Sequence, residues 1–214
     1  MNKSKRHSQQ RGFTLIELLL VVLLLSIIVG AVFSQIERAQ VRYRVEDQKV
    51  DLTQQEREFI DQFTRDLHQA GYPSASMLGP GATANQIAAG VLSVSGNDLV
   101  MEGDVDGDGV VDRVEYSYFD GSGWAGPGPN PCPCIRRSSQ PKGSAGPATN
   151  FTEVQNVVGT SFFAALNSTG GAAADLPSTK AVQITLTTQG TTQDNDVQKS
   201  VQVTMTGIAR LVNN

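Results

Sequence analysis

The acidic residues between positions 104 and 115 have the types and the spacing to bind a cation. This segment reads DVDGDGVVDRVE, with Gly109 at its sixth place and Val110 at its seventh. Its acids stand at the first, third, fifth, ninth and twelfth places: Asp104, Asp106, Asp108, Asp112 and Glu115. Carboxylates at alternate positions can wrap a hard cation, the glycine allows a sharp bend, and the backbone carbonyl of Val110 adds a further oxygen ligand. The segment therefore predicts a calcium site, because flexible all-oxygen sites suit calcium better than magnesium.

The pattern matches the EF-hand loop, although its surroundings differ from those of an EF-hand. The residues on both sides are typical of strands, and Asp-Gly-Asp-Gly also favours a tight hairpin turn. The alternative is a solvated turn in which Glu115 points outward from a strand. If calcium binds, we expect it to rigidify the hairpin.

Other combinations of reactive residues lack partners. Cys132 and Cys134 are two of the four ligands that a structural zinc site needs, and they are spaced either for a strained local bridge or for two thiols. His68 lies in a solvated helical pattern without a nucleophile elbow beside it. We therefore predict no catalytic residues, no cofactor besides calcium, and no enzyme.

The charge distribution disfavours nucleic-acid binding. The chain has 17 Lys+Arg and 21 Asp+Glu, but Lys3, Lys5, Arg6 and Arg11 stand before position 13, so the remainder is near −8 (17 − 4 − 21). After position 12 the sequence has one basic cluster, which consists of Arg136, Arg137 and Lys142. Such a cluster in a loop is usually solvated. The charge distribution therefore argues against a nucleic-acid partner.

Residues 13–33 form the strongest signal in the chain. They read FTLIELLLVVLLLSIIVGAVF, 21 residues with one charge at Glu17, which is long enough to cross a bilayer as a helix. The basic leader predicts that its own side stays in the cytoplasm and that everything after Phe33 crosses the membrane. A carboxylate in a membrane helix costs several kcal/mol unless it has a partner, so Glu17 predicts a function.

The string Arg11-Gly12-Phe13-Thr14-Leu15-Ile16-Glu17 resembles the processing motif of the type IV prepilin family. The resemblance implies that residues 1–12 are a leader, that a prepilin peptidase cuts after Gly12, and that Phe13 is then methylated. It also implies that Glu17 pairs with the terminal amine of a neighbouring subunit and so sets the assembly register. The alternative is a chance glutamate in an uncleaved signal anchor.

A helix is expected over residues 13–71, with residues 13–33 as its transmembrane part. After position 33 the apolar residues fall on one face, at Val45, Leu52, Phe59, Phe63 and Leu67. Gly71 and Pro73 end the pattern. The stretch Thr64 to Tyr72 resembles the end of this helix in PilW-like minor pilins.

Residues 72–214 are expected to form a β-rich head. The predicted strands are 91–95, 98–102, 110–119, 161–166, 180–188 and 197–211, and residues 120–150, rich in proline and glycine, are predicted to be a long loop. The predicted fold class is α+β: a long N-terminal helix packed on an antiparallel sheet, as in pilins.

Together with these features, the resemblance to prepilins and PilW-like pilins implies a structural minor pilin that takes part in type IV pilus assembly and priming. Its implied partners are other major and minor pilins, the prepilin peptidase and the inner-membrane assembly platform. Its implied location is the inner membrane, as a single-pass protein with a periplasmic C-terminal domain, and then the pilus or cell surface. The close alternative is a GspJ-like pseudopilin of a type II secretion system. Alternatives from other classes are a DNA-uptake pilin and a signal-anchored calcium-binding surface protein.

Overall fold

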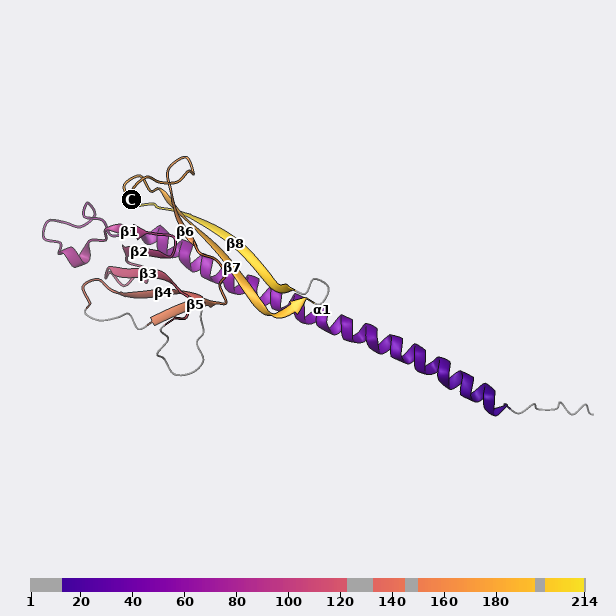
Figure 1. Cartoon of the computed structure of the whole chain (residues 1–214). Coiled ribbons are helices and arrows are strands. Elements are labelled where there is room, and N and C mark those ends of the chain that lie inside the picture. The colour runs from indigo at the N-terminus through magenta and orange to yellow at the C-terminus, as the bar shows by residue number, and fades with distance from the viewer. Residues whose placement is uncertain (1–12, 123–132, 145–149, 195–198, 214) are drawn as a thin grey trace, which may run out of the picture. The chain divides into compact units, whose positions relative to one another are not determined.

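The computed structural model describes residues 13–122, 133–144, 150–194 and 199–213. In these residues the chain forms one long helix, one 3₁₀ turn and eight strands (Figure 1). Their bounds are α1 (Leu15–Gln69), η1 (Ala84–Gln86), β1 (Gly90–Val94), β2 (Asp98–Gly103), β3 (Asp112–Phe119), β4 (Cys134–Pro141), β5 (Asn150–Gln155), β6 (Phe163–Leu166), β7 (Ala181–Asp194) and β8 (Lys199–Arg210). The chain divides into two compact units, residues 1–44 and residues 45–214.

The described part of the first unit is helical and leaves its apolar side chains exposed. Leu19, Leu23 and Ile27 are each more than half exposed. By length and composition, α1 has a stretch that is apolar enough to cross a membrane. The predicted helix over residues 13–71 agrees with α1 to within two residues at each end.

The second unit packs the rest of α1 against two antiparallel sheets. One sheet has the order β1-β2-β3-β4-β5, and the other has the order β6-β7-β8. Figure 1 shows β7 and β8 running along α1. The fold is therefore α+β, as predicted, with two sheets where one was expected.

The core lies between α1 and both sheets. The predicted apolar positions of the helix are all buried: Val45, Leu52, Phe59, Phe63 and Leu67. Phe59 and Phe63 meet the ring of Tyr116 edge to face, with centroids 5.7 and 5.5 Å apart. Two acids, Glu56 and Asp66, lie on the same buried face of the helix.

The prediction of a loop over residues 120–150 is wrong for its later part. Residues 134–141 form β4, in the interior of the five-stranded sheet between β3 and β5. The strand was missed because its sequence, CIRRSSQP, contains two arginines and little apolar content. Both arginines have acidic partners elsewhere in the head, and a strand in the interior of a sheet tolerates charge when it is paired.

Candidate metal centre and membrane helix

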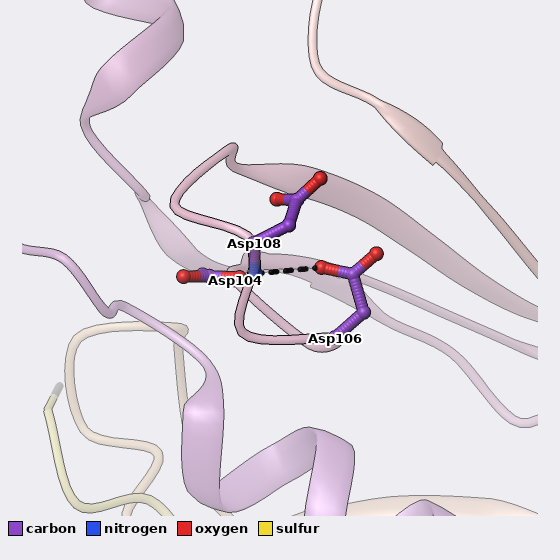
Figure 2. A group of neighbouring side chains, drawn as sticks. All are labelled: Asp104, Asp106 and Asp108. Atoms are coloured by element: carbon purple, nitrogen blue, oxygen red, sulfur yellow. Dashed lines mark hydrogen bonds between the residues drawn. The ribbon is translucent and has the colours of Figure 1, made fainter.

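The aspartate-rich segment connects β2 to β3. Figure 2 shows the side chains of Asp104, Asp106 and Asp108 around one turn of this loop. One carboxylate oxygen from each of the three lies within 4.8 Å of the others. Asp104 is buried, and Asp106 and Asp108 are exposed. The loop therefore brings together the first, third and fifth residues of the predicted ligand set.

Backbone amides hold these carboxylates in place. Asp104 accepts from the N–H of Gly107 at 2.8 Å and from the N–H of Gly109 at 3.1 Å. Asp106 accepts from the Asp108 N–H at 3.2 Å, the dashed line in Figure 2, and Asp108 accepts from the Val110 N–H at 2.7 Å. Gly109 has a φ of +84°, so the predicted glycine bend occurs where the left-handed backbone demands it.

The start of the loop is attached to the end of α1. With its amide nitrogen turned toward the loop, Gln69 donates to the carbonyl oxygens of Val105 at 2.9 Å and Asp104 at 3.1 Å. The Asp104 N–H donates to the Tyr72 carbonyl at 2.9 Å. A side chain on Gly103 would overlap the Gln69 carbonyl, so only glycine permits this close approach. The carbonyl-rich, negative end of the helix therefore lies against the acidic loop.

The negative charge of the loop affects the pKa of Asp112. Burial, together with the charges of Asp106, Asp108 and Asp104, raises the pKa of Asp112 from 3.8 to about 6, although the charge of Arg137 lowers it. A cation between these carboxylates would remove that repulsion.

The remaining predicted ligands lie outside the group of three. Glu115 is exposed on β3 and accepts from the Ser117 hydroxyl at 2.9 Å. Because side chains alternate along a strand, Glu115 points to the face opposite that of Asp112. Val110 is 45% exposed at the end of the loop.

The basic cluster singled out in the sequence consists of paired charges. Arg136 pairs with Glu153 at 2.9 Å, Arg137 with Asp66 at 2.5 Å and Lys142 with Glu102 at 2.6 Å. These partners neutralise the cluster, which weakens it as a grip for phosphates.

The pair of Asp66 and Arg137 belongs to a buried network that sequence reasoning missed. Asp66 is fully buried on α1 and also accepts from the Tyr116 hydroxyl at 2.7 Å and from the Gln62 amide at 2.7 Å. Burial, and then the adjacent Asp66 charge, raise the pKa of Tyr116 well above 10. The contacts of Asp66 with Tyr116 and Arg137 join residues 50 or more positions apart, so no local pattern could indicate them.

Cys134 is buried and disulfide-bonded. Cys132, the other cysteine in the sequence, lies outside the described residues. His68 is exposed near the end of α1.

The first residues of α1 carry the predicted processing and assembly positions. Gly12 lies outside the described residues, and Phe13 is 78% exposed. The Glu17 N–H donates to the Thr14 carbonyl at 3.1 Å and lies 3.4 Å from the Thr14 hydroxyl oxygen. Glu17 is therefore presented on an exposed helix start, next to the chain end that cleavage after Gly12 would create.

Comparison with protein families gives one match at this place. Residues 7–33 match the family model of the prokaryotic N-terminal methylation motif. No curated protein and no solved structure matches the chain. This motif runs directly into an apolar helix, and the later part of the helix packs against antiparallel sheets. The combination supports a type IV prepilin-like protein. The apolar part of the helix is consistent with a single-pass inner-membrane anchor.

Proposed function

We propose that the chain is a structural minor pilin of the PilW-like branch, which takes part in assembling and priming a type IV pilus. A prepilin peptidase cleaves it after Gly12 and methylates Phe13. The mature chain then enters the filament from the inner membrane, with its C-terminal head in the periplasm, through contacts with other pilins and the assembly platform. The observation that carries this proposal is the methylation motif over residues 7–33 leading into an exposed apolar helix.

In this proposal, assembly of the subunits depends on Glu17 at the start of α1. In the bilayer or in a filament core, Glu17 has a strong need for a cationic partner because a lone carboxylate there costs several kcal/mol. The methylated amine at Phe13 of a neighbouring subunit supplies that charge, and the pair sets the axial register of the two helices.

Mass spectrometry of the N-terminal peptide from the native membrane or sheared surface fraction tests the processing. We expect the chain to begin at N-methylated Phe13. Recovery of the intact leader would instead favour a signal-anchored surface protein. Glu17→Ala should leave cleavage intact and reduce the amount of the chain in sheared filaments, whereas unchanged incorporation would remove Glu17 from the assembly mechanism. Loss of protein secretion rather than of pili on deletion would favour the GspJ-like alternative.

We also propose that the loop of Asp104, Asp106 and Asp108 binds calcium. The gathered carboxylates, the raised pKa of Asp112 and the nearby negative end of α1 support this. The carbonyl of Val110 and the carboxylate of Asp112 complete the proposed ligand set, whereas the predicted ligand Glu115 points to the opposite face of β3 and is left out of it. Calcium would rigidify the hairpin and, because the loop is bonded to Gln69, the end of the helix as well.

Calorimetry on the full chain in detergent micelles tests the calcium proposal. We expect heat on titration with calcium and its loss in the double variant Asp106→Ala, Asp108→Ala. Asp175→Ala is the control, since Asp175 also caps an exposed turn, by accepting from the Ser178 N–H at 2.9 Å, but belongs to no acidic group among the residues that the structure describes. Absence of calcium heat in the unaltered chain would refute the site.

A further inference from the structure

Strand β8 has an open edge. It pairs with β7 and lies at the end of the order β6-β7-β8. The far edge of β7 is occupied by β6 and by residues 156–158, since Val158 N–H donates to Thr187 at 2.7 Å and Gln189 N–H donates to Asn156 at 2.9 Å. In the described part of the chain, residues 200–209 make no backbone hydrogen bond beyond their ladder with β7.

The ladder geometry shows which backbone groups face the open edge. The N–H groups of Thr185 and Gln189 and the carbonyl of Thr187 point away from β8. Their partners are Thr206, Gln202 and Thr204, which are therefore non-hydrogen-bonded pairs in the antiparallel ladder. The backbone N–H and C=O groups of four residues therefore point away from β7, toward the open edge: Gln202, Thr204, Thr206 and, by alternation, Ile208. The short distance between the Thr187 and Thr204 hydroxyl oxygens, 2.9 Å, agrees with such a pair.

This edge has none of the usual protection against strand pairing. Residues 200–209 read SVQVTMTGIA, without proline or charge, and their register with β7 is unbroken from Gln202 to Arg210. The other edge strands are protected: β1 contains a register shift between Val91 and Ser93, β5 has six residues and carries the ion-paired Glu153, and β6 has only four residues. A long, uncharged, open edge is a template for another strand.

We propose that β8 pairs antiparallel with β8 of a second copy of this chain, about a two-fold axis at Met205. In this register Gln202 lies opposite Ile208 and Thr204 opposite Thr206. The backbone groups of all four residues that point to the open edge therefore form hydrogen bonds with the second copy. On the inner face Val203 lies opposite Gly207, which leaves room for the valine side chain. No like charges are opposed, and the symmetry is the commonest among homo-oligomers.

The direction of β8 determines how the two heads meet. Val201 packs with Val45 and Leu52, whereas Gly207 lies against Ile60, so β8 runs in the same direction as the helix beneath it. The two-fold axis reverses this direction in the partner. The pair therefore joins heads that approach from opposite directions, as on two filaments. The joining of two filaments rests on the proposed pilin function, whereas the pairing of two β8 strands does not.

Two pairs of variants of the full chain in detergent micelles test the proposal. Met205→Cys places two thiols opposite each other across the axis and should form a disulfide-linked dimer on mild oxidation. Thr187→Cys, on the outer face of β7 away from the edge, is the control and should remain largely monomeric.

The second pair tests the register. Thr204→Lys with Thr206→Lys opposes like charges and should abolish the dimer seen by light scattering, whereas Thr204→Lys with Thr206→Glu opposes unlike charges and should retain it. Thr204 and Thr206 are exposed on the outward face of β8, so the head should fold in both of these double variants. A monomer at every concentration, equal crosslinking of both cysteine variants, or a dimer that survives the lysine pair would each overturn the proposal. The N-terminal mass spectrum is independent of these results, so failure of the pairing and failure of the pilin function are distinguishable.

Discussion

The buried pair of Asp66 and Arg137 gives the sharpest test of what holds the helix to the head. Asp66 is completely buried on α1, and the Arg137 side chain on β4 is 13% exposed. Replacing Asp66 with Asn keeps the shape of the side chain but leaves the guanidinium without its counter-charge. The variant should therefore reveal the cost of an unpaired charge rather than the cost of lost packing.

The expected changes in the free energy of unfolding follow from the burial of this ion pair. Removing one partner of a buried ion pair costs about 3–5 kcal/mol, a large part of the ~5–15 kcal/mol that stabilises a typical domain. Replacing both partners, by Asp66→Leu with Arg137→Met, removes the unpaired charge and leaves the Tyr116 hydroxyl without its acceptor, at about 1–3 kcal/mol. Adding Tyr116→Phe to that double variant should bring the cost back near zero, because the whole network has then been replaced by apolar groups.

Pulse proteolysis in urea measures these free energies for the head of the full chain. Glu153→Gln is the control, since its partner Arg136 forms a similar pair at 2.9 Å with side chains 17% and 25% exposed. Such a partly exposed pair should contribute at most about 1 kcal/mol. The reasoning is refuted if Asp66→Asn costs no more than Glu153→Gln, or if the triple variant is as unstable as Asp66→Asn.

Three further predictions concern the helix and the loop. Burial raises the pKa of Glu56 above 4.5, against the hydrogen bonds from Thr188, and its Oε2 has no partner in the described residues, so stability is lost as pH rises through the folded pKa. Glu56→Gln should raise the urea midpoint under alkaline conditions and flatten its fall with pH, and an unchanged pH profile would contradict this. Asp112 has a folded pKa of about 6 against 3.8, so it stabilises the calcium-free fold below 3.8 and loses that contribution as pH rises through 6; Asp112→Asn should remove this decline from the urea midpoint measured against pH. Gly103→Ala should destabilise the head by about 1–3 kcal/mol in urea because its side chain meets the Gln69 carbonyl, whereas Gly79→Ala, which meets nothing within 4 Å, should have little effect.

The sequence predicts the helix well because its apolar positions repeat on one face. Leu52, Phe59 and Phe63 are buried where the pattern places them. The same pattern misses Glu56 and Asp66, since a charged residue on the core face is tolerated only through partners such as Thr188 and Arg137, which lie far along the chain. The strand β4 is missed for the same reason.

The acidic loop shows which residues of a site can be predicted from their spacing in the sequence. Asp104, Asp106 and Asp108 are close in sequence and are brought together by one turn, so their grouping follows from the motif. The direction of Glu115 depends on the alternation of β3, and the face that β3 turns toward the core is determined by Val114 and Tyr116. Long-range packing therefore decides the residues of the motif that lie on the strand.

The attachment of α1 to the head also has a mechanical consequence. Near Gln69 the helix end is bound by the bridge between Ala70 and Gly103 and by the hydrogen bond from Gly71 N–H to the Glu102 carbonyl at 2.9 Å, while Asp66 is held by Arg137. If the chain assembles into a filament as proposed, tension on the filament loads each subunit through its helix. These contacts lie close together, at Asp66 in the last turn of α1 and at the two residues just after the helix, so we expect a pull along the helix to load them together rather than break them one after another. Asp66→Asn should then lower the unfolding force of the head in single-molecule pulling, and an unchanged force would show that the load takes another route.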